Sequence, residues 1–153
     1  MNNIETPPIK KELVIEASQE KAFKVFTEKM DLWWPRTHHI GATPMTEIVV
    51  EPGVNGRWYS KHEDGSEVEV GKVLTWDPYG LLVLGWQING EFKYIPDLIT
   101  EVEVQFIAEG PKITRVKFEH KNLDRLGSGK HVDSMDEGWG YIMDLYKSTV
   151  SQV

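Results

Sequence analysis

The side chains in this sequence that could do chemistry are chiefly aromatic residues and histidines. Six tryptophans and five histidines occur in 153 residues, and cysteine is absent. The absence of cysteine excludes disulfides, thiolate metal sites and a cysteine nucleophile. Tryptophan supplies a large apolar surface with one hydrogen-bond donor, which suits the wall of a binding cavity. The excess of tryptophan therefore favours a ligand-binding site with aromatic walls.

The histidines do not show the spacing of a metal site. His38 and His39 are adjacent, so their side chains diverge, and no carboxylate lies at ligand spacing beside them. His120 ends an apolar strand face after Val116 and Phe118. We expect it to be either a polar group directed at a cavity or a core histidine with satisfied hydrogen bonds. We expect no metal and no cofactor.

Other catalytic arrangements have little support. Acidic residues in two of the predicted strands alternate on faces that we expect to be exposed to solvent. These residues are Glu67, Glu69, Glu101 and Glu103. No G-x-S-x-G motif is present, and the segment 127–130 lacks the upstream glycine of a phosphate-binding loop. Enzymatic activity stays open, and the sequence favours a protein without one.

Charge and hydropathy narrow the function classes further. Lysine and arginine total 17 against 24 aspartate and glutamate residues, a formal net charge of -7. This balance argues against nucleic-acid and anionic-membrane partners, which both favour basic surfaces. The longest apolar run, residues 81–85, is far shorter than the roughly 20 residues that cross a bilayer. Because the N-terminus does not resemble a secretory signal, we expect a cytoplasmic protein. Residues 1–8 are expected to form a flexible arm and residues 9–153 a single domain.

Alternating hydrophobicity predicts a set of antiparallel strands. Strands are predicted over residues 9–16, 46–51, 57–63, 67–76, 81–88, 98–108 and 113–120. Asp64-Gly65 and Asn89-Gly90 are typical of hairpin turns. Ser18 is expected to cap a short helix over residues 19–29. After a polar loop at 121–130, a 3.6-residue period predicts a long helix over residues 132–150.

This order of elements predicts an α+β fold. A curved antiparallel sheet of about six to seven strands wraps around the long C-terminal helix, with short helices after the first strand. A sheet of this size must twist and curl around the helix. The curl leaves room between sheet and helix for a ligand cavity.

Several segments, taken in order, carry a family resemblance. They are 56–59 (GRWY), 64–68 (DGSEV), 71–78 (GKVLTWDP), 82–88 (LVLGWQI), 100–104 (TEVEV) and 138–140 (GWG). Together they resemble the SRPBCC superfamily of START-like, helix-grip proteins, whose fold is also described as Bet v allergen-like. The branch they are most similar to is the bacterial proteins that resemble the C-terminal domain of the heat shock protein 90 ATPase activator. The resemblance covers residues 9 to 150. It implies a cavity for an apolar or amphipathic molecule and no shared catalytic motif.

Strand parity places the candidate cavity residues on inward faces. The expected walls are Trp58, Trp86, Phe106, Phe118, Trp139 and Met143. His120, Tyr94 or Arg57 would supply polarity, although Arg57 and Trp58 alternate and cannot share one face unless the strand bulges. Trp33 and Trp34, where the first helix ends, would form the cavity entrance, with one inside and one exposed, or would both pack under a loop.

Gly138 and Gly140 flank Trp139 on the final helix. Together they cost about 1–2 kcal/mol relative to alanine. Either they thin the helix where a ligand or strand approaches, or they allow dense packing of Trp139 against the sheet.

Three functions remain open from the sequence. The first is a binding protein for a hydrophobic or aromatic small molecule. The second is an interaction protein that contacts a chaperone of the heat shock protein 90 class through Trp33, Trp34 and the acidic surface. The third is a cyclase- or dehydratase-like enzyme that uses His120 or Tyr94 for proton transfer. The oligomeric state is undetermined.

Overall fold

Seven strands form one antiparallel sheet. A computed structural model of the chain describes residues 7–39, 41–89, 93–126 and 132–153. The strands are β1 (Ile9–Ile15), β2 (Met45–Val50), β3 (Arg57–His62), β4 (Glu67–Asp77), β5 (Leu81–Trp86), β6 (Thr100–Gly110) and β7 (Ile113–Lys121). Their order in the sheet is β1-β7-β6-β5-β4-β3-β2. Neighbours from β2 to β7 are therefore consecutive in sequence, and β1 joins at the β7 edge.

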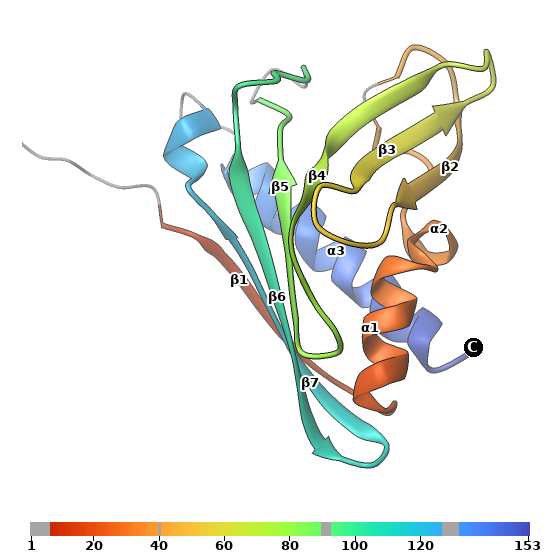
Figure 1. Cartoon of the computed structure of the whole chain (residues 1–153), viewed down its shortest axis with the longest axis vertical. Coiled ribbons are helices and arrows are strands. Elements are labelled where there is room, and N and C mark those ends of the chain that lie inside the picture. The colour runs from red at the N-terminus through yellow and green to blue at the C-terminus, as the bar shows by residue number, and fades with distance from the viewer. Residues whose placement is uncertain (1–6, 40, 90–92, 127–131) are drawn as a thin grey trace, which may run out of the picture.

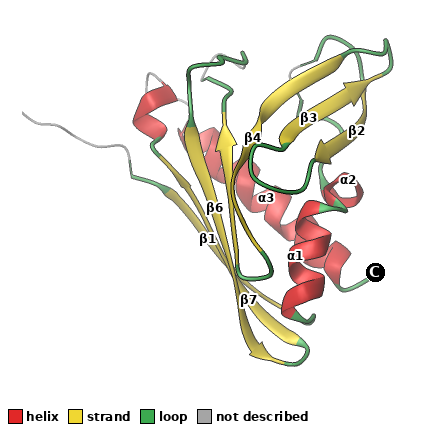
Figure 2. Cartoon of the chain, viewed as in Figure 1, coloured by secondary structure: helices red, strands yellow, loops and turns green. Residues whose placement is uncertain are grey.

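The helices follow the first strand and the last. They are α1 (Gln19–Thr27), α2 (Met30–Trp33), a short 3-10 helix (Leu123–Leu126) and α3 (Val132–Val150). The Ser18 hydroxyl accepts a hydrogen bond from the Lys21 backbone N–H at 3.2 Å, so Ser18 caps α1 as predicted. Figure 1 shows α3 running along the sheet, and Figure 2 shows α2 beside β2 and α1 beside the C-terminal end of α3.

Residue alternation decides which face of the sheet meets α3. In β6 the buried residues are Thr100, Val102, Val104 and Phe106, and the residues between them are partly exposed. The register pairs Trp86 of β5 with Thr100, and Val102 with His120 of β7. Trp86, Thr100 and His120 therefore gather at one end of the inner face, where the cavity lies.

A cluster of aromatic and apolar side chains fills the other end of the fold. Phe23 and Phe26 of α1 pack edge to face on Phe106, at ring-centroid distances of 5.3 and 5.8 Å. The Tyr146 hydroxyl donates to the Ala22 carbonyl oxygen at 2.7 Å, which ties α3 to α1. Burial raises the pKa of Tyr146, so this hydroxyl keeps its proton. The C-terminal half of α3 therefore packs against the hydrophobic core.

The predicted architecture is confirmed, with differences at the ends of elements. The curved sheet around a long C-terminal helix is the helix-grip arrangement expected from the sequence. The first helix ends at Thr27 rather than at residue 29, and the separate turn α2 follows it. The predicted strand 81–88 ends at Trp86, and Ile88 instead forms an isolated bridge with Tyr94.

Some expectations fall outside the described residues. These are most of the expected arm, residues 1–6, together with Gly90 of the second turn and residues 127–130 of the polar loop. Within the described parts of the chain, no helix is both long and apolar enough to cross a membrane.

Candidate ligand cavity

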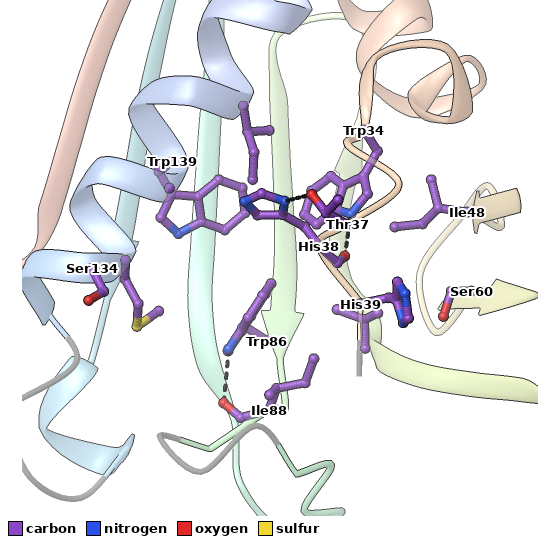
Figure 3. A pocket seen from close by; sticks show the side chains of 14 residues that line it. Trp34, Thr37, His38, His39, Ile48, Ser60, Trp86, Ile88, Ser134 and Trp139 are labelled. Carbon is purple, nitrogen blue, oxygen red and sulfur yellow. Dashed lines mark hydrogen bonds between the residues drawn. The ribbon is translucent and has the colours of Figure 1, made fainter. Parts of the chain in front are cut away.

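A cavity of about 310 Å³ lies between the N-terminal half of α3, the strands β2 to β5 and the segment that follows α2 (Figure 3). Its volume is at the lower end of the range for small-molecule sites. The lining residues are Trp34, Thr37, His38, His39, Ile48, Ser60, Val70, Trp86, Ile88, Ser134, Met135, Gly138, Trp139 and Ile142. Most of them are apolar, so the cavity suits a hydrophobic guest.

Four tryptophans form a closed ring of edge-to-face contacts in the wall of this cavity. Trp34 contacts Trp139 and Trp58 at ring-centroid distances of 5.8 and 5.9 Å. Trp86 contacts Trp139 and Trp58 at 5.6 Å each. Trp58 is fully buried behind the others, while the remaining three line the cavity. Edge-to-face pairs add about 0.5–1.5 kcal/mol each beyond area burial, so the ring holds its members in fixed orientations.

Each of the three lining indoles has its N–H group bonded within the protein. Trp34 Nε1 donates to the His38 carbonyl oxygen at 2.8 Å, and Trp86 Nε1 donates to the Ile88 carbonyl oxygen at 2.9 Å. Trp139 Nε1 donates to His120 Nδ1 at 3.1 Å. Because the only polar atom of each ring is occupied, these side chains offer a ligand apolar surface alone.

His120 lies behind this wall and does not line the cavity. Its Nδ1 accepts from Trp139, so the neutral ring carries its proton on Nε2, which donates to Thr100 Oγ1 at 2.8 Å. Thr100 in turn donates to the Trp86 carbonyl oxygen at 3.1 Å. Burial lowers the pKa of His120 to about 3, which keeps the ring neutral at ordinary pH. Of the two interpretations drawn from the sequence, the core histidine with satisfied hydrogen bonds is the one that the geometry supports.

The polar part of the lining comes from the segment after α2, from β3 and, through Ser134, from α3. Thr37 Oγ1 and His38 Nδ1 lie 2.9 Å apart, and burial lowers the pKa of His38. Ser60 lies 2.7 Å from His62 Nε2, and His39 packs on the His62 ring at 5.0 Å. Sequence reasoning treated His38 and His39 only as possible metal ligands and did not select Ser60. Ser60 shares the inward parity of Trp58, and that parity was the available signal.

A bulge shapes the wall beside Ser60. Trp58 pairs with Gly71, but the next residue, Tyr59, pairs with Glu69, so Val70 is an extra residue in β4. A bulge re-aims a side chain relative to regular pairing. Val70 accordingly joins the cavity lining next to β3.

Three of the expected wall residues lie in the packed core instead. Phe106, Phe118 and Met143 are each about 1% exposed and do not line the cavity. Phe118 supports the wall indirectly, because its ring packs on Trp139 at 4.6 Å.

Trp33 does not form a cavity entrance. It is 2% exposed, donates to the Val25 carbonyl oxygen at 2.8 Å and packs on Tyr146 at 5.3 Å. Trp34 is 6% exposed and lines the cavity. Both tryptophans are therefore buried.

Arg57 and Tyr94 also lie away from the cavity lining. Arg57 sits on the outer face of the sheet, where it forms ion pairs with Glu67 and Glu69 and stacks on Tyr59 at 3.8 Å. These carboxylates raise the pKa of Arg57 through hydrogen bonds. Tyr94 instead pairs with Ile88 through a backbone bridge.

The two glycines of α3 have different surroundings. Gly138 lines the cavity, and a Cβ added there would meet no atom within 4 Å. A Cβ on Gly140 would lie 3.6 Å from Lys11 Nζ, and Lys11 pairs with Asp136 at 2.9 Å. Gly138 thus leaves open space on the cavity side of the helix, while Gly140 lies against β1.

No cluster of three histidine or acidic residues suited to a metal ion occurs in the described parts of the chain. A curved sheet that holds a long helix over an apolar cavity defines the class of SRPBCC, helix-grip proteins. The family model described as "Activator of Hsp90 ATPase homolog 1-like protein" matches residues 16–151, and the chain belongs to that family. No curated protein matches the sequence.

Solved structures resemble the whole chain. The self-sacrificing resistance protein CalC from Micromonospora echinospora is 33% identical, with a TM-score of 0.67 over 95% of each chain. The anthrahydroquino-γ-pyrone synthase Txn09, solved in a complex, is 32% identical, with a TM-score of 0.65 over 94% of this chain and 97% of that one. The Aha1 dimer from Colwellia psychrerythraea is 18% identical, with a TM-score of 0.69 over 95% of this chain and 96% of that one, and shows the fold alone.

Proposed function

We propose that this protein binds a flat aromatic small molecule in the cavity under the N-terminal half of α3. The observation that carries the proposal is the ring of four tryptophans, three of which present apolar faces to the cavity. Rigid aromatic walls favour planar guests, because stacked and edge-to-face contacts need flat partners. A flexible acyl chain gains less from such walls.

The polar side of the cavity gives the ligand an orientation. His39 and Ser60 lie on the side of β3, away from Trp139 on α3, while His38 lies beside α3, where its ring packs on Tyr141 at 5.9 Å. A ligand with one polar edge and an apolar body matches this division. The polar edge would face Ser60, and the body would lie against the indoles.

One relative supports an aromatic ligand. The name of the Txn09 synthase, 32% identical to this chain, describes a product with fused aromatic rings. The relation covers nearly the full length of both chains, so the cavity-forming elements have counterparts. For this chain we propose the ligand class and leave the reaction aside.

The structure buries or displaces residues that the other two expected functions were to use. Chaperone contact was expected to use Trp33, Trp34 and the acidic surface, and of these both tryptophans are buried. Proton transfer was expected from His120 or Tyr94, and neither lines the cavity. The cytoplasmic location stays a prediction from the sequence.

Quenching of tryptophan emission by 2-naphthol tests the proposal. Three tryptophans line the cavity, so binding should quench a large, saturable part of the emission. The control is Gly138→Leu, in which the new side chain enters the open space beside Trp139. We expect saturable quenching in the natural protein and none in the variant. Linear quenching that is equal in both proteins would contradict the proposal.

A further inference from the structure

Ser60, His62 and the Thr43 carbonyl group form a hydrogen-bonded chain at the polar side of the cavity. Ser60 Oγ lies 2.7 Å from His62 Nε2, and His62 Nδ1 lies 2.8 Å from the Thr43 carbonyl oxygen. Ser60 is 2% exposed and lines the cavity, while His62 is 4% exposed and lies behind it. The chain therefore leads from the cavity surface into the protein.

Hydrogen-bond chemistry fixes the direction of each proton in this chain. A carbonyl oxygen can only accept, so Nδ1 of His62 carries a proton. In the neutral imidazole the other nitrogen, Nε2, is then an acceptor. The Ser60 hydroxyl must donate its single proton to Nε2. Ser60 Oγ keeps lone pairs and has no proton left to donate.

The packing around His62 prevents the ring from turning to another arrangement. The Cα of Gly41 lies over the imidazole, and an added Cβ would overlap the ring atoms. His39 also packs edge to face on the His62 ring, at a ring-centroid distance of 5.0 Å. The acceptor character of Ser60 is thus built into the local structure.

The hydrogen-bond chain through His120 provides a contrast. There, Trp139 donates to His120, His120 donates to Thr100, and Thr100 donates to a backbone carbonyl, all behind the cavity wall. That chain orients the wall and ends within the protein. Among the described residues, Ser60 Oγ bonds to His62 alone, so its remaining lone pairs face the cavity side.

We propose that Ser60 accepts a hydrogen bond from a ligand hydroxyl group, so that the cavity selects phenol-type aromatic molecules over analogues of the same shape without a donor. This inference rests on the proposed function, since it assigns the polar edge of the same aromatic ligand. A ligand carbonyl at this place would face an oxygen with no proton to offer and would be disfavoured.

Titration calorimetry with two probes of matched shape tests the inference. The probes are 2-naphthol, which carries a hydroxyl donor, and 2-methylnaphthalene, which carries a methyl group at the same position. At pH 8 we expect 2-naphthol to bind about fivefold more tightly, the effect of one neutral hydrogen bond. In Ser60→Ala the ratio of the two affinities should fall to about one.

Ser151→Ala is the matched control, because Ser151 follows α3, is exposed and does not line the cavity. It should keep the fivefold ratio. If Ser60→Ala does not fold, Ser60→Cys retains the shape with a weaker acceptor and should also lower the ratio. Equal affinities in the natural protein, or an unchanged ratio in both Ser60 variants, would overturn the inference and leave the proposed function standing. Binding of neither probe would overturn both.

Discussion

Trp139 on α3 donates its indole proton to His120 on β7 at 3.1 Å, and this bond fixes a cavity wall from behind. It joins two elements that the sequence separates by a long loop. His120 also holds Thr100, which bonds to the backbone of Trp86. One buried imidazole thereby orients two of the three indoles that line the cavity.

Replacing His120 by leucine should damage both stability and binding. The change leaves the Trp139 indole N–H and the Thr100 hydroxyl without their buried partner, at a cost of about 1–3 kcal/mol for each group. We expect the free energy of unfolding, measured with denaturant, to fall by about 2 kcal/mol or more. We also expect 2-naphthol to bind more weakly. Trp139→Phe is the companion variant, because it removes the donor and leaves only Nδ1 of His120 without its partner. Natural-like stability for His120→Leu would show that the chain of hydrogen bonds contributes nothing.

Stability should fall as the pH drops below about 6.5, because the pKa of His120 is lowered to about 3 in the folded state. Between these two values the unfolded chain binds a proton that the folded chain does not, so acid favours unfolding. The contribution is about 2 kcal/mol between pH 7 and pH 5.

Urea unfolding at a series of pH values measures this dependence. In His120→Gln, whose side chain cannot titrate, the unfolding free energy should fall by about 2 kcal/mol less between pH 7 and pH 5 than in the natural protein. Identical slopes for both proteins would mean that His120 does not stay neutral in the fold.

Gly138→Ala should stabilise the protein and leave room for a small ligand. Alanine improves helix propensity by up to about 1 kcal/mol, and its methyl group meets no atom within 4 Å. Gly140→Ala is the control on the other side of the helix, where contact with Lys11 leaves ligand binding untouched. Thermal unfolding reports the stability gain. A loss of stability in Gly138→Ala would mean that the space beside it is filled.

Arg57→Ala should have no effect on ligand affinity. Arg57 pairs with Glu67 and Glu69 on the outer face, on the other side of the sheet from the cavity. Exposed ion pairs contribute about 0–1 kcal/mol, so the change in unfolding free energy should be small. Calorimetry with 2-naphthol checks the affinity. A large loss would place Arg57 in the site after all.

Periodicity predicted which face each residue occupies, and for this reason it located Trp86 and Trp139. A period of two residues fixes the inward side of a strand, and a period of 3.6 fixes the stripe of a helix. Periodicity does not show where along that face a residue lies, and therefore whether it meets the cavity or the packed core. Phe106 and Phe118 point inward as expected, yet they lie where α1 and α3 close over the sheet, so the core covers them.

The sequence pattern does not show how deeply an inward side chain is buried or how a loop is folded. His120 faces inward, but Trp139 covers it. The segment 37–39, which supplies one side of the cavity, has no regular period that could predict its side-chain directions. Ser60 could have been selected by parity with Trp58. Its acceptor role depends on the Thr43 carbonyl group, which only the folded chain brings to His62.

The indole N–H signals of the six tryptophans, followed by two-dimensional NMR during titration with 2-naphthol, test the central claim most directly. We expect large shifts for Trp34, Trp86 and Trp139, which line the cavity. Trp76 packs at the other end of the fold, against Phe23, and should not move. Trp33 does not line the cavity but contacts Trp34 at a ring-centroid distance of 6.1 Å, so its signal should shift less than those of the three lining indoles. Shifts confined to Trp33 and Trp76, or no shifts at saturating probe, would contradict an aromatic site under α3.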